Sequence, residues 1–413
     1  MEFAFTEEHL MIRDSAERFL AQASDSHAVR AAMNRPDAHD PEIWQRIGKE
    51  LYWPALMVPE RFGGMGLGFV ELAILLEQSG RYLLGSPLFA TACLATPALL
   101  LGHNKLIQEH WLGTIAAGET RATLAFASVP GLEACSVQAV AAPCPGGWTL
   151  DGQYAQVIDG ASADLLIVAA RAPDTQGERG ISLFVLPGNT PGVVRTPLAT
   201  LDQTRRLACI ELHDVQVSEA QQLCGPEQGW AVLRDTLLIA TIGLAAEQTG
   251  GAQQALDLTL AYIAERRQFK RTIASFQAIK HRCADMMLQV ECARSAAYYA
   301  ACVAQERLDP KGDAAVAQEI EQAAATAKIH ASEAFFHCAA ESIQLHGGVG
   351  FTWEYDPHLY FKRARASEHL LGSPALHRER LAKHLLGEQP RKSVSVMQMK
   401  CSAKKSPSGW PST

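Results

Sequence analysis

The sequence predicts an α+β protein in three parts, with helical regions at both ends of the chain and a β region between them. Residues before about 120 and after about 222 carry apolar side chains at helical spacing and much alanine. Between them, glycine, proline and β-branched runs replace that pattern. The chain has 413 residues, which is enough for two or three domains or one large unit with several parts. The division we expect is an N-terminal helical domain over 1–120, a middle β domain over 121–222, a C-terminal helical bundle over 223–386, and a polar, disordered tail over 387–413.

The first part begins with a helix whose start is marked by Thr6, a residue type that caps helix N-termini. The apolar stripe that follows consists of Leu10, Met11, Ala16, Phe19 and Leu20. The glycine-rich run Pro59–Gly68 (PERFGGMGLG) then interrupts the helices, which resume over Phe69–Gly80. No predicted strand precedes these glycines, so we interpret the run as a turn between packed helices rather than as a phosphate-binding loop.

The middle part carries three clear strand patterns, over Leu165–Ala170, Ile181–Leu186 and Ile210–Val217. Turn sequences such as Asp151-Gly152 and Pro187-Gly188 separate them. This pattern predicts a compact, barrel-like β domain.

Three long helices are predicted in the last part. Leu233–Ala246 is apolar almost all round, which is typical of a central buried helix. A stripe from Phe276 to Ala297, which includes Met287, predicts a second helix, and the alanine-rich stretch Ala314–Leu345 predicts a third. Together with the segment before residue 386, they indicate a four-helix bundle.

Composition excludes several classes of protein. Hydrophobic residues make up 48% of the chain and charged residues 20%, which is ordinary for a globular protein. The formal charge of −7 argues against nucleic acid or an anionic membrane as the main partner. The ten cysteines include no CxxC pair, and we expect Cys93, Cys283, Cys292, Cys302 and Cys338 to be small buried thiols in a reducing compartment.

Neither a metal site nor a targeting segment is predicted. The fourteen histidines form no metal-binding spacing, and we expect His330 and His337 to lie in the core or at an interface. The acidic, amphipathic N-terminus lacks the features of a signal peptide, and we find no apolar run of transmembrane length. We therefore expect a cytoplasmic location.

Two motifs in the last part are the most specific features of the chain. Tyr262–Phe269 (YIAERRQF) is followed by Phe276-Gln277, and Ile343–Gly350 (IQLHGGVG) comes later. Their content and spacing resemble the acyl-CoA dehydrogenase family, and the similarity extends over about residues 1–386. The resemblance implies the acyl-CoA dehydrogenase fold, FAD as cofactor, and α,β-desaturation of an acyl-CoA thioester in lipid metabolism. It also implies an electron-transferring flavoprotein as the usual electron acceptor.

The same resemblance implies a set of flavin contacts. In the family, the corresponding residues reach across a subunit interface and hold the adenosine and pyrophosphate of the neighbour's FAD. A guanidinium such as that of Arg266 clamps a pyrophosphate with charge-assisted bonds, although a solvated basic face is the simpler interpretation of an isolated arginine. Glycines allow the backbone to approach the cofactor closely. The implied contacts in this chain are Arg266, Phe269, Gln277, Gln344, Gly347 and Gly348.

The half-site that would hold the flavin ring departs from the family pattern. Ser128 keeps a hydroxyl at the position of a flavin-contacting threonine, and we retain it as a cofactor-binding candidate. Gln156 stands where the family usually has an aromatic ring that covers the flavin. Ile158 stands where a threonine hydroxyl usually bonds near the reactive nitrogen, and an isoleucine cannot donate that bond.

The catalytic base is also missing. Family members carry a glutamate at one of two positions, which here hold Leu371 and Ala240, and neither side chain can take a proton. We therefore predict no catalytic residue in this chain. Glu368, one helical turn before Leu371, is the alternative base, and a surface pair with Lys362 or Arg365 is its simpler interpretation.

Three functions are compatible with this pattern. The preferred one is a subunit that lacks the base and serves the FAD of a second acyl-CoA dehydrogenase-like chain in an α2β2 complex. This pattern resembles the heteromeric acyl-CoA dehydrogenases of bacterial steroid side-chain degradation, which suggests a steroid side-chain CoA ester as substrate. The alternatives are a homotetrameric dehydrogenase with a displaced base and a non-enzymatic acyl-CoA-binding scaffold of the same fold.

Overall fold

A computed structural model describes residues 5–35, 39–129 and 131–387 of the chain. The tail that we expected to be disordered lies outside these residues from position 388 onward. As predicted, Thr6 caps the first helix, because its side chain accepts a hydrogen bond from the backbone N–H of His9. The helices of the first part are α1 (Glu7–Ala23), α2 (Ser26–Met33), α3 (Pro41–Lys49), α4 (Phe69–Arg81), α5 (Thr96–Leu101) and α6 (Lys105–Ala116).

The glycine-rich run before α4 is a turn, as predicted. A short 3-10 helix, Glu60–Phe62, lies inside it, and among residues 5–35 and 39–58 no strand precedes it. A Cβ added to Gly64 would lie 1.9 Å from the carbonyl oxygen of Val58, so the glycine is required by the chain's own backbone. Packing within the turn therefore explains Gly64 without a ligand.

The middle part forms one sheet of eight strands. Seven of them follow the order β6-β7-β3-β2-β4-β5-β8, and β1 pairs in parallel with β4 at the side of this path. Every residue from Leu165 to Ala170 is buried, because both faces of the sheet are covered there. The strands are β1 (Ala122–Ala125), β2 (Val140–Cys144), β3 (Gly147–Ile158), β4 (Leu165–Arg171), β5 (Ile181–Pro187), β6 (Val193–Pro197), β7 (Leu207–Ser218) and β8 (Gln222–Cys224).

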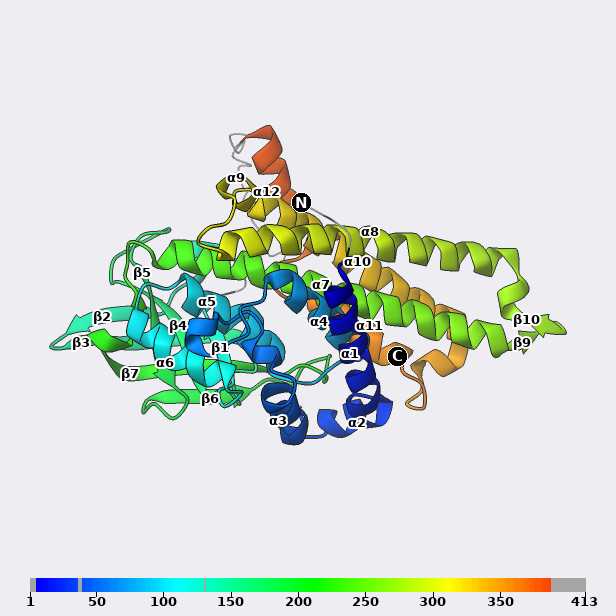
Figure 1. Cartoon of the computed structure of the whole chain (residues 1–413), viewed down its shortest axis with the longest axis horizontal. Coiled ribbons are helices and arrows are strands. Elements are labelled where there is room, and N and C mark those ends of the chain that lie inside the picture. Colours follow the sequence, from blue (N-terminus) through cyan, green and yellow to red (C-terminus); the bar gives the residue numbers. More distant parts are fainter. Residues whose placement is uncertain (1–4, 36–38, 130, 388–413) are drawn as a thin grey trace, which may run out of the picture.

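The last part is the helical bundle, and its long helices run along the longest axis of the molecule (Figure 1). The predicted central helix lies inside α7, which packs against α4, α8, α10 and α11. A short hairpin of β9 (Arg267–Gln268) and β10 (Arg271–Thr272) follows α7. The helices are α7 (Gly229–Glu265), α8 (Gln277–Leu308), α9 (Ala314–Ala317), α10 (Ile320–His346), α11 (Pro357–His369) and α12 (Pro374–Leu386).

Our expectation that no apolar run reaches transmembrane length was wrong for α7. Among the described helices it is the one that is long and apolar enough to cross a membrane by length and composition. However, 89% of its most apolar 18-residue window is buried inside the protein. That burial is typical of the core helix of a folded domain.

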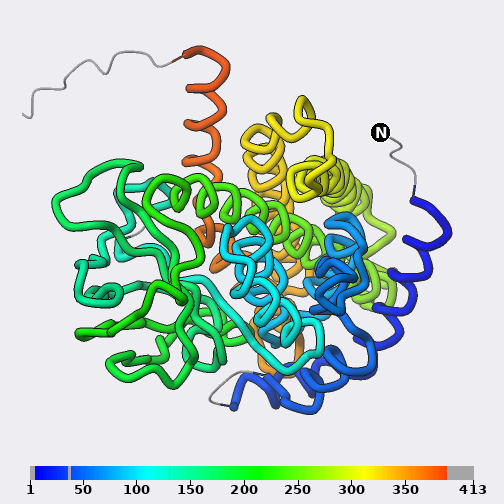
Figure 2. Tube along the Cα trace, turned by 60° about the vertical axis from the view of Figure 1, so that its left-hand side comes forward, coloured from blue at the N-terminus to red at the C-terminus, as the bar shows by residue number. Residues whose placement is uncertain are grey.

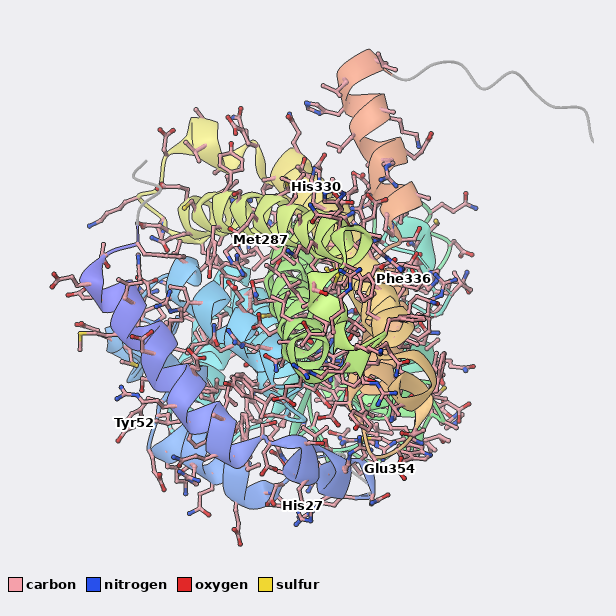
Figure 3. All side chains as sticks on the ribbon, turned by 90° about the vertical axis from the view of Figure 1, so that its right-hand side faces the viewer. His27, Tyr52, Met287, His330, Phe336 and Glu354 are labelled. Carbon is pink, nitrogen blue, oxygen red and sulfur yellow. The ribbon has the colours of Figure 1, made fainter. Side chains whose placement is uncertain are left out.

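Three expectations about the bundle need correction. The predicted helix over Ala314–Leu345 is divided into α9 and α10, with a break at residues 318–319 that no glycine or proline marks. Met287, which we placed in an apolar stripe, is 58% exposed and lies on the outer face of α8 (Figure 3). Cys292 is exposed rather than buried, and Cys302 is half-buried. In each case, the spacing of apolar residues identified the helix but not what covers its faces.

Figure 2 shows α12 standing away from the body of the molecule. Leu385 and Leu386 at its end are 74% and 72% exposed. The other end of α12 follows the Leu371 segment, so it contributes to the site described next.

Candidate functional site: two half-sites in one chain

The two sequence motifs meet at the end of the bundle that lies opposite the β domain (Figure 1). The ring of Tyr262, near the end of α7, stacks on the imidazole of His346 at the end of α10, with 4.3 Å between the centroids. Ile263, Cys283 and Leu345 form a small apolar core there. Packing thus brings together residues that lie far apart in the chain, and we call the surface around them the outer half-site.

The residues implied as flavin contacts are open to solvent on this surface. Phe269 is 86% exposed, which is unusual for a large apolar side chain. Arg266 makes no side-chain hydrogen bond or ion pair with any residue that the structure describes. The full set of exposed residues is Arg266, Phe269, Gln277, Gln344, Gly347 and Gly348.

The β9–β10 hairpin presents Phe269 at its tip. Phe269 and Lys270 have φ angles of +53° and +64°, in the left-handed region that bulky residues rarely occupy. Behind the tip, the guanidinium of Arg271 lies 3.9 Å from the centroid of the Phe276 ring. A strained backbone that holds an aromatic ring in solvent suggests a binding role for that ring.

Gly347 and Gly348 face open space. A Cβ added to either residue would meet nothing within 4 Å. Gly347 has a φ of +66°, which favours glycine. Gly348 has no such backbone requirement, so nothing within this chain explains the absence of a side chain there. A ligand or partner that approaches the backbone would explain it.

A second group of predicted positions lines a cavity of about 450 Å³ between the β domain and residues 369–376, which we call the inner half-site. Gln156 and Ile158 come from β3, and Leu371 comes from the opposite wall. Ile158 and Leu371 are buried, with exposures of 3% and 6%. The Oγ atom of Ser128 is buried without a hydrogen-bond partner in the described chain, beside the lining residues Ala127 and Val129. It is the one implied flavin contact retained on this side.

The inner half-site offers no carboxylate. Of the described residues that line it, His369 is the one with a titratable side chain. Ala240 is fully buried on α7 and does not line this cavity. The two positions that the resemblance assigns to the base, Leu371 and Ala240, are thus both buried and aliphatic.

Glu368 does not substitute for the missing base. Its Oε2 atom accepts a hydrogen bond from Nη1 of Arg365 at 2.5 Å, and its side chain does not line the cavity. Of the two interpretations that the sequence left open for Glu368, the structure shows the ion pair with Arg365.

The backbone around Leu371 is nevertheless held firmly. Leu371 has a φ of +54°, and its carbonyl oxygen accepts a hydrogen bond of 2.9 Å from Nε2 of His377. Burial lowers the pKa of His377 to about 4, so the ring is neutral near pH 7. The Nζ atom of buried Lys328 donates to the carbonyl oxygen of Ser367 at 2.6 Å, and burial lowers the pKa of this amine to about 7. Hydrogen bonds from His377 and Lys328 thus hold the backbone of this segment, although the side chain of Leu371 has no group that can take up a proton.

Sequence reasoning missed a buried ionic cluster beside the inner half-site. Arg363 pairs with Asp202 through Nε at 2.7 Å and with Glu247 through Nη1 at 2.6 Å. Arg205 pairs with the other oxygen of Glu247 at 2.5 Å. Burial raises the pKa of Glu247, but the two arginines outweigh it and hold the pKa below its usual value. The basic run that contains Arg363 was visible in the sequence, but spacing alone could not show which arginine is buried.

Comparison with known proteins places this architecture in one family. Residues 6–119 match the N-terminal domain of acyl-CoA dehydrogenases, and residues 227–386 match their C-terminal domain. The chain therefore belongs to the acyl-CoA dehydrogenase family, whose members are flavoproteins that use FAD and act on acyl-CoA thioesters. This confirms the family, the fold and the cofactor expected from the sequence.

The chain can also be compared with individual relatives. The chain is 36% identical over 368 residues to the acyl-CoA dehydrogenase IpdE2 of Mycobacterium tuberculosis, covering 89% of this chain and 94% of that protein. A glutaryl-CoA dehydrogenase in complex with glutaryl-CoA has a TM-score of 0.85 at 26% identity, covering 94% of this chain and 98% of that one. The ChsE4–ChsE5 complex of Mycobacterium tuberculosis has a TM-score of 0.83 at 26% identity, covering 94% of this chain and 100% of the matched chain.

The two half-sites fit FAD unequally. At the outer half-site, an unpaired guanidinium, an exposed phenyl ring and an open glycine backbone suit a pyrophosphate and an adenosine. At the inner half-site, the hydroxyl of Ser128 has no hydrogen-bond partner in the described chain. By the family resemblance, Gln156 stands in place of an aromatic ring that covers the flavin, Ile158 in place of a hydroxyl that bonds to it, and Leu371 in place of the base. The chain's own residues thus fit one half of the cofactor well and the other half poorly.

Proposed function

We propose that this chain is one subunit of a FAD-dependent acyl-CoA dehydrogenase and supplies the outer half-site to the FAD of a second, catalytic subunit. The observation that carries the proposal is the contrast between the two half-sites. The outer half-site keeps all of its implied contacts, and they are exposed to solvent. The inner half-site lacks the family's carboxylate base, and Ile158 offers no hydrogen bond where the family's threonine does.

Each outer residue has a physical role in this proposal. Arg266 neutralises the pyrophosphate, and Phe269 covers the apolar surface of the cofactor. Gln277 and Gln344 offer amide hydrogen bonds, and Gly347 and Gly348 let the backbone come close. FAD supplies the hydride acceptor when it is bound, and the partner subunit supplies the base that removes the α-proton.

Exposed apolar side chains support a protein partner. On α8, Met287 and Leu288 are 58% and 64% exposed, and in the loop before α11, Phe351 and Trp353 are 70% and 60% exposed. Met287 lies on the side of the molecule that carries the outer half-site (Figure 3). Large exposed apolar side chains of this kind favour an interface with another chain.

The relatives support a heteromeric assembly and a bulky substrate. One similar structure is the ChsE4–ChsE5 complex, and another is the Tcur3481–Tcur3483 steroid acyl-CoA dehydrogenase, with 28% identity and a TM-score of 0.80. We extend this to an α2β2 complex that acts on the CoA ester of a steroid side chain. A cytoplasmic location and an electron-transferring flavoprotein as acceptor belong to the same proposal.

The homotetrameric and scaffold alternatives are less well supported. A homotetramer needs a base in the inner half-site, and His369 is the one titratable side chain that lines it. A non-enzymatic scaffold has no use for an unpaired arginine and an open glycine backbone at the outer half-site.

The deciding experiment measures flavin content and turnover of the full chain, alone and after coexpression with a second acyl-CoA dehydrogenase-like chain encoded next to it. We expect little FAD and no turnover alone, and one FAD per pair of unlike chains with turnover in the complex. A yellow, active homotetramer with one FAD per chain would contradict the proposal, and loss of that activity in His369→Gln would then identify the displaced base.

A further inference from the structure

A second cavity, of about 230 Å³, adjoins the inner half-site. The two share the lining residues Gln156, His369 and Leu370. The second cavity lies between residues 200–207 of the β domain and α11, and we call it the lateral cavity. Leu201 and Leu207 are the leucines of its β-domain wall.

An incompletely paired charge lines the lateral cavity. The side chain of Arg205 is 10% exposed, and its guanidinium lies 4.7 Å from the centroid of the Phe89 ring. Its Nη2 atom pairs with Glu247, but its Nη1 atom is buried and has no hydrogen-bond partner in the described chain. A buried cationic donor without an acceptor is unfavourable, so the site calls for an acceptor oxygen.

The other charged groups at this cavity are already satisfied. Arg363 has Asp202, Glu247 and the hydroxyl of Thr204 as partners. Asp202 in turn accepts hydrogen bonds from the backbone and side chain of Thr204. Of the charged residues that line the cavity, Arg205 therefore has the free binding capacity.

Backbone strain occurs at and next to residues that line these cavities. Gln156, Asp159 and Leu371 have φ angles of +56°, +52° and +54°, although none of them is glycine. Left-handed conformations of such residues are maintained against a free-energy cost and cluster at ligand sites. Two of these three residues line the cavities directly.

We propose that the lateral cavity binds a small carboxylic acid with an apolar body. Its carboxylate would accept a hydrogen bond from Nη1 of Arg205, and its hydrocarbon part would lie among Leu201, Leu207 and Leu370. The inference rests on the proposed function, because the inner half-site beside this cavity is free only in a subunit that does not hold its own flavin ring. The ligand site would make this subunit responsive to a free acid while the partner performs catalysis.

Titration measurements on the purified full-length chain with hexanoate, and with 1-hexanol as the uncharged probe, test the proposal. We expect hexanoate to bind at least about tenfold more tightly than 1-hexanol, because the hydrogen bond to Arg205 is charge-assisted. Arg205→Gln keeps a donor towards Glu247 but removes the charge, so it should weaken hexanoate binding by a similar factor.

A second variant tests the site independently in case Arg205→Gln fails to fold. Leu201 is 58% exposed, so Leu201→Trp blocks the lateral cavity from its surface and should abolish hexanoate binding while leaving the fold intact. Leu106→Trp, at a 75% exposed leucine of α6 that does not line the cavity, is the matched control and should bind hexanoate normally. Equal binding of both probes, or hexanoate binding that survives Leu201→Trp, would overturn the inference.

The pH dependence of hexanoate binding is an independent test of the proposal. Asp159 directly follows β3 and interacts electrostatically with Arg205, with Arg363 on α11, with Glu247 on α7 and with Arg121 before β1. Burial raises the pKa of Asp159 to about 7. Below that pH the neutral carboxyl no longer repels an acid, so hexanoate binding should tighten as the pH falls from 8 to 6 and take up a proton. Affinity that is flat or weakens over this range would contradict the site.

Flavin content measured in the same samples separates the two proposals. If the chain alone holds one FAD, the proposed function fails and the inference fails with it. If the chain alone is free of flavin and hexanoate does not bind, only the inference about the lateral cavity is wrong.

Discussion

The outer and inner half-sites belong to the same fold, but they differ in how many of their polar and apolar groups lack a partner in the described chain. The outer half-site exposes an unpaired arginine, a phenyl ring at 86% exposure and glycines with open space around them. The inner half-site buries Ile158 and Leu371, and the ionic cluster beside it pairs Arg363 with Asp202 and Glu247 inside the chain. A surface that is incomplete by itself is typical of a binding interface, and a region that is closed and apolar is typical of a structural core. The contrast supports the proposal that this chain keeps half of an active site for use by a neighbouring subunit.

The largest expected effect comes from Arg363→Met, which tests the buried ionic cluster beside the inner half-site. This change leaves Asp202 and Glu247 buried with too few cations, so we expect a loss of about 3–5 kcal/mol in the free energy of unfolding. Chemical denaturation measures it. Arg365→Met is the matched control on the same helix. Its arginine is 47% exposed and pairs with Glu368, so the change should be within about 0.5 kcal/mol. Similar losses in both variants would show that the cluster is not what holds this region together.

Restoring the missing carboxylate asks whether the inner half-site is catalytically silent. Leu371→Glu places a carboxyl at a position that is 6% exposed, which should destabilise the chain by on the order of 3 kcal/mol. It should add no turnover, because Gln156 and Ile158 still lack the groups that would cover and bond a flavin ring. Leu371→Met controls for volume. Turnover of a CoA ester by purified Leu371→Glu chain alone would show that only the base had been lost.

At the outer half-site, Arg266→Ala tests whether this chain binds its partner's cofactor. Loss of a charge-assisted bond to the pyrophosphate should weaken FAD binding by the complex roughly ten- to a hundred-fold, with little change in this chain's stability. Arg267→Ala removes an adjacent exposed charge and should leave the FAD content unchanged. Equal FAD content in the two variants would reduce Arg266 to a surface charge.

The pH dependence of stability tests the role of buried His377, whose ring donates a hydrogen bond to the carbonyl oxygen of Leu371. Burial lowers the pKa of His377 from 6.5 to about 4 in the folded chain. The unfolded chain therefore binds a proton below pH 6.5 that the folded chain refuses, and stability contributed by the neutral ring is lost as the pH falls from 6.5 to about 4. We expect a loss of about 2 kcal/mol over this window from this group. His377→Gln keeps a donor for the Leu371 carbonyl and should flatten the profile. An unchanged slope would assign the pH dependence to other groups.

The sequence identified residues of both half-sites, but it did not predict the buried ionic cluster beside the inner one, for a physical reason. Arg266, Phe269 and the Gly347-Gly348 pair lie in short motifs whose local order fixes their geometry. The buried cluster joins Arg205, Glu247 and Arg363, which come from three segments, and their distances depend on how the β domain packs against the bundle. Met287 was misplaced because periodicity detects an apolar face without showing whether the face packs inside the chain or against another chain.

The smallest expected change in stability tests whether the outer half-site needs a residue without a side chain at position 348. Gly348→Ala adds a Cβ that meets nothing within 4 Å, so the free energy of unfolding should change by less than about 0.5 kcal/mol. FAD retention by the complex should still fall several-fold, because the new methyl group lies where we expect the cofactor to approach. Gly113→Ala on α6 is the control, since its Cβ would meet only the carbonyl oxygen of Phe62 at 3.8 Å and it lies away from the half-site. If FAD retention is equal in the two variants, the open space at Gly348 serves the partner's protein surface or solvent rather than the cofactor.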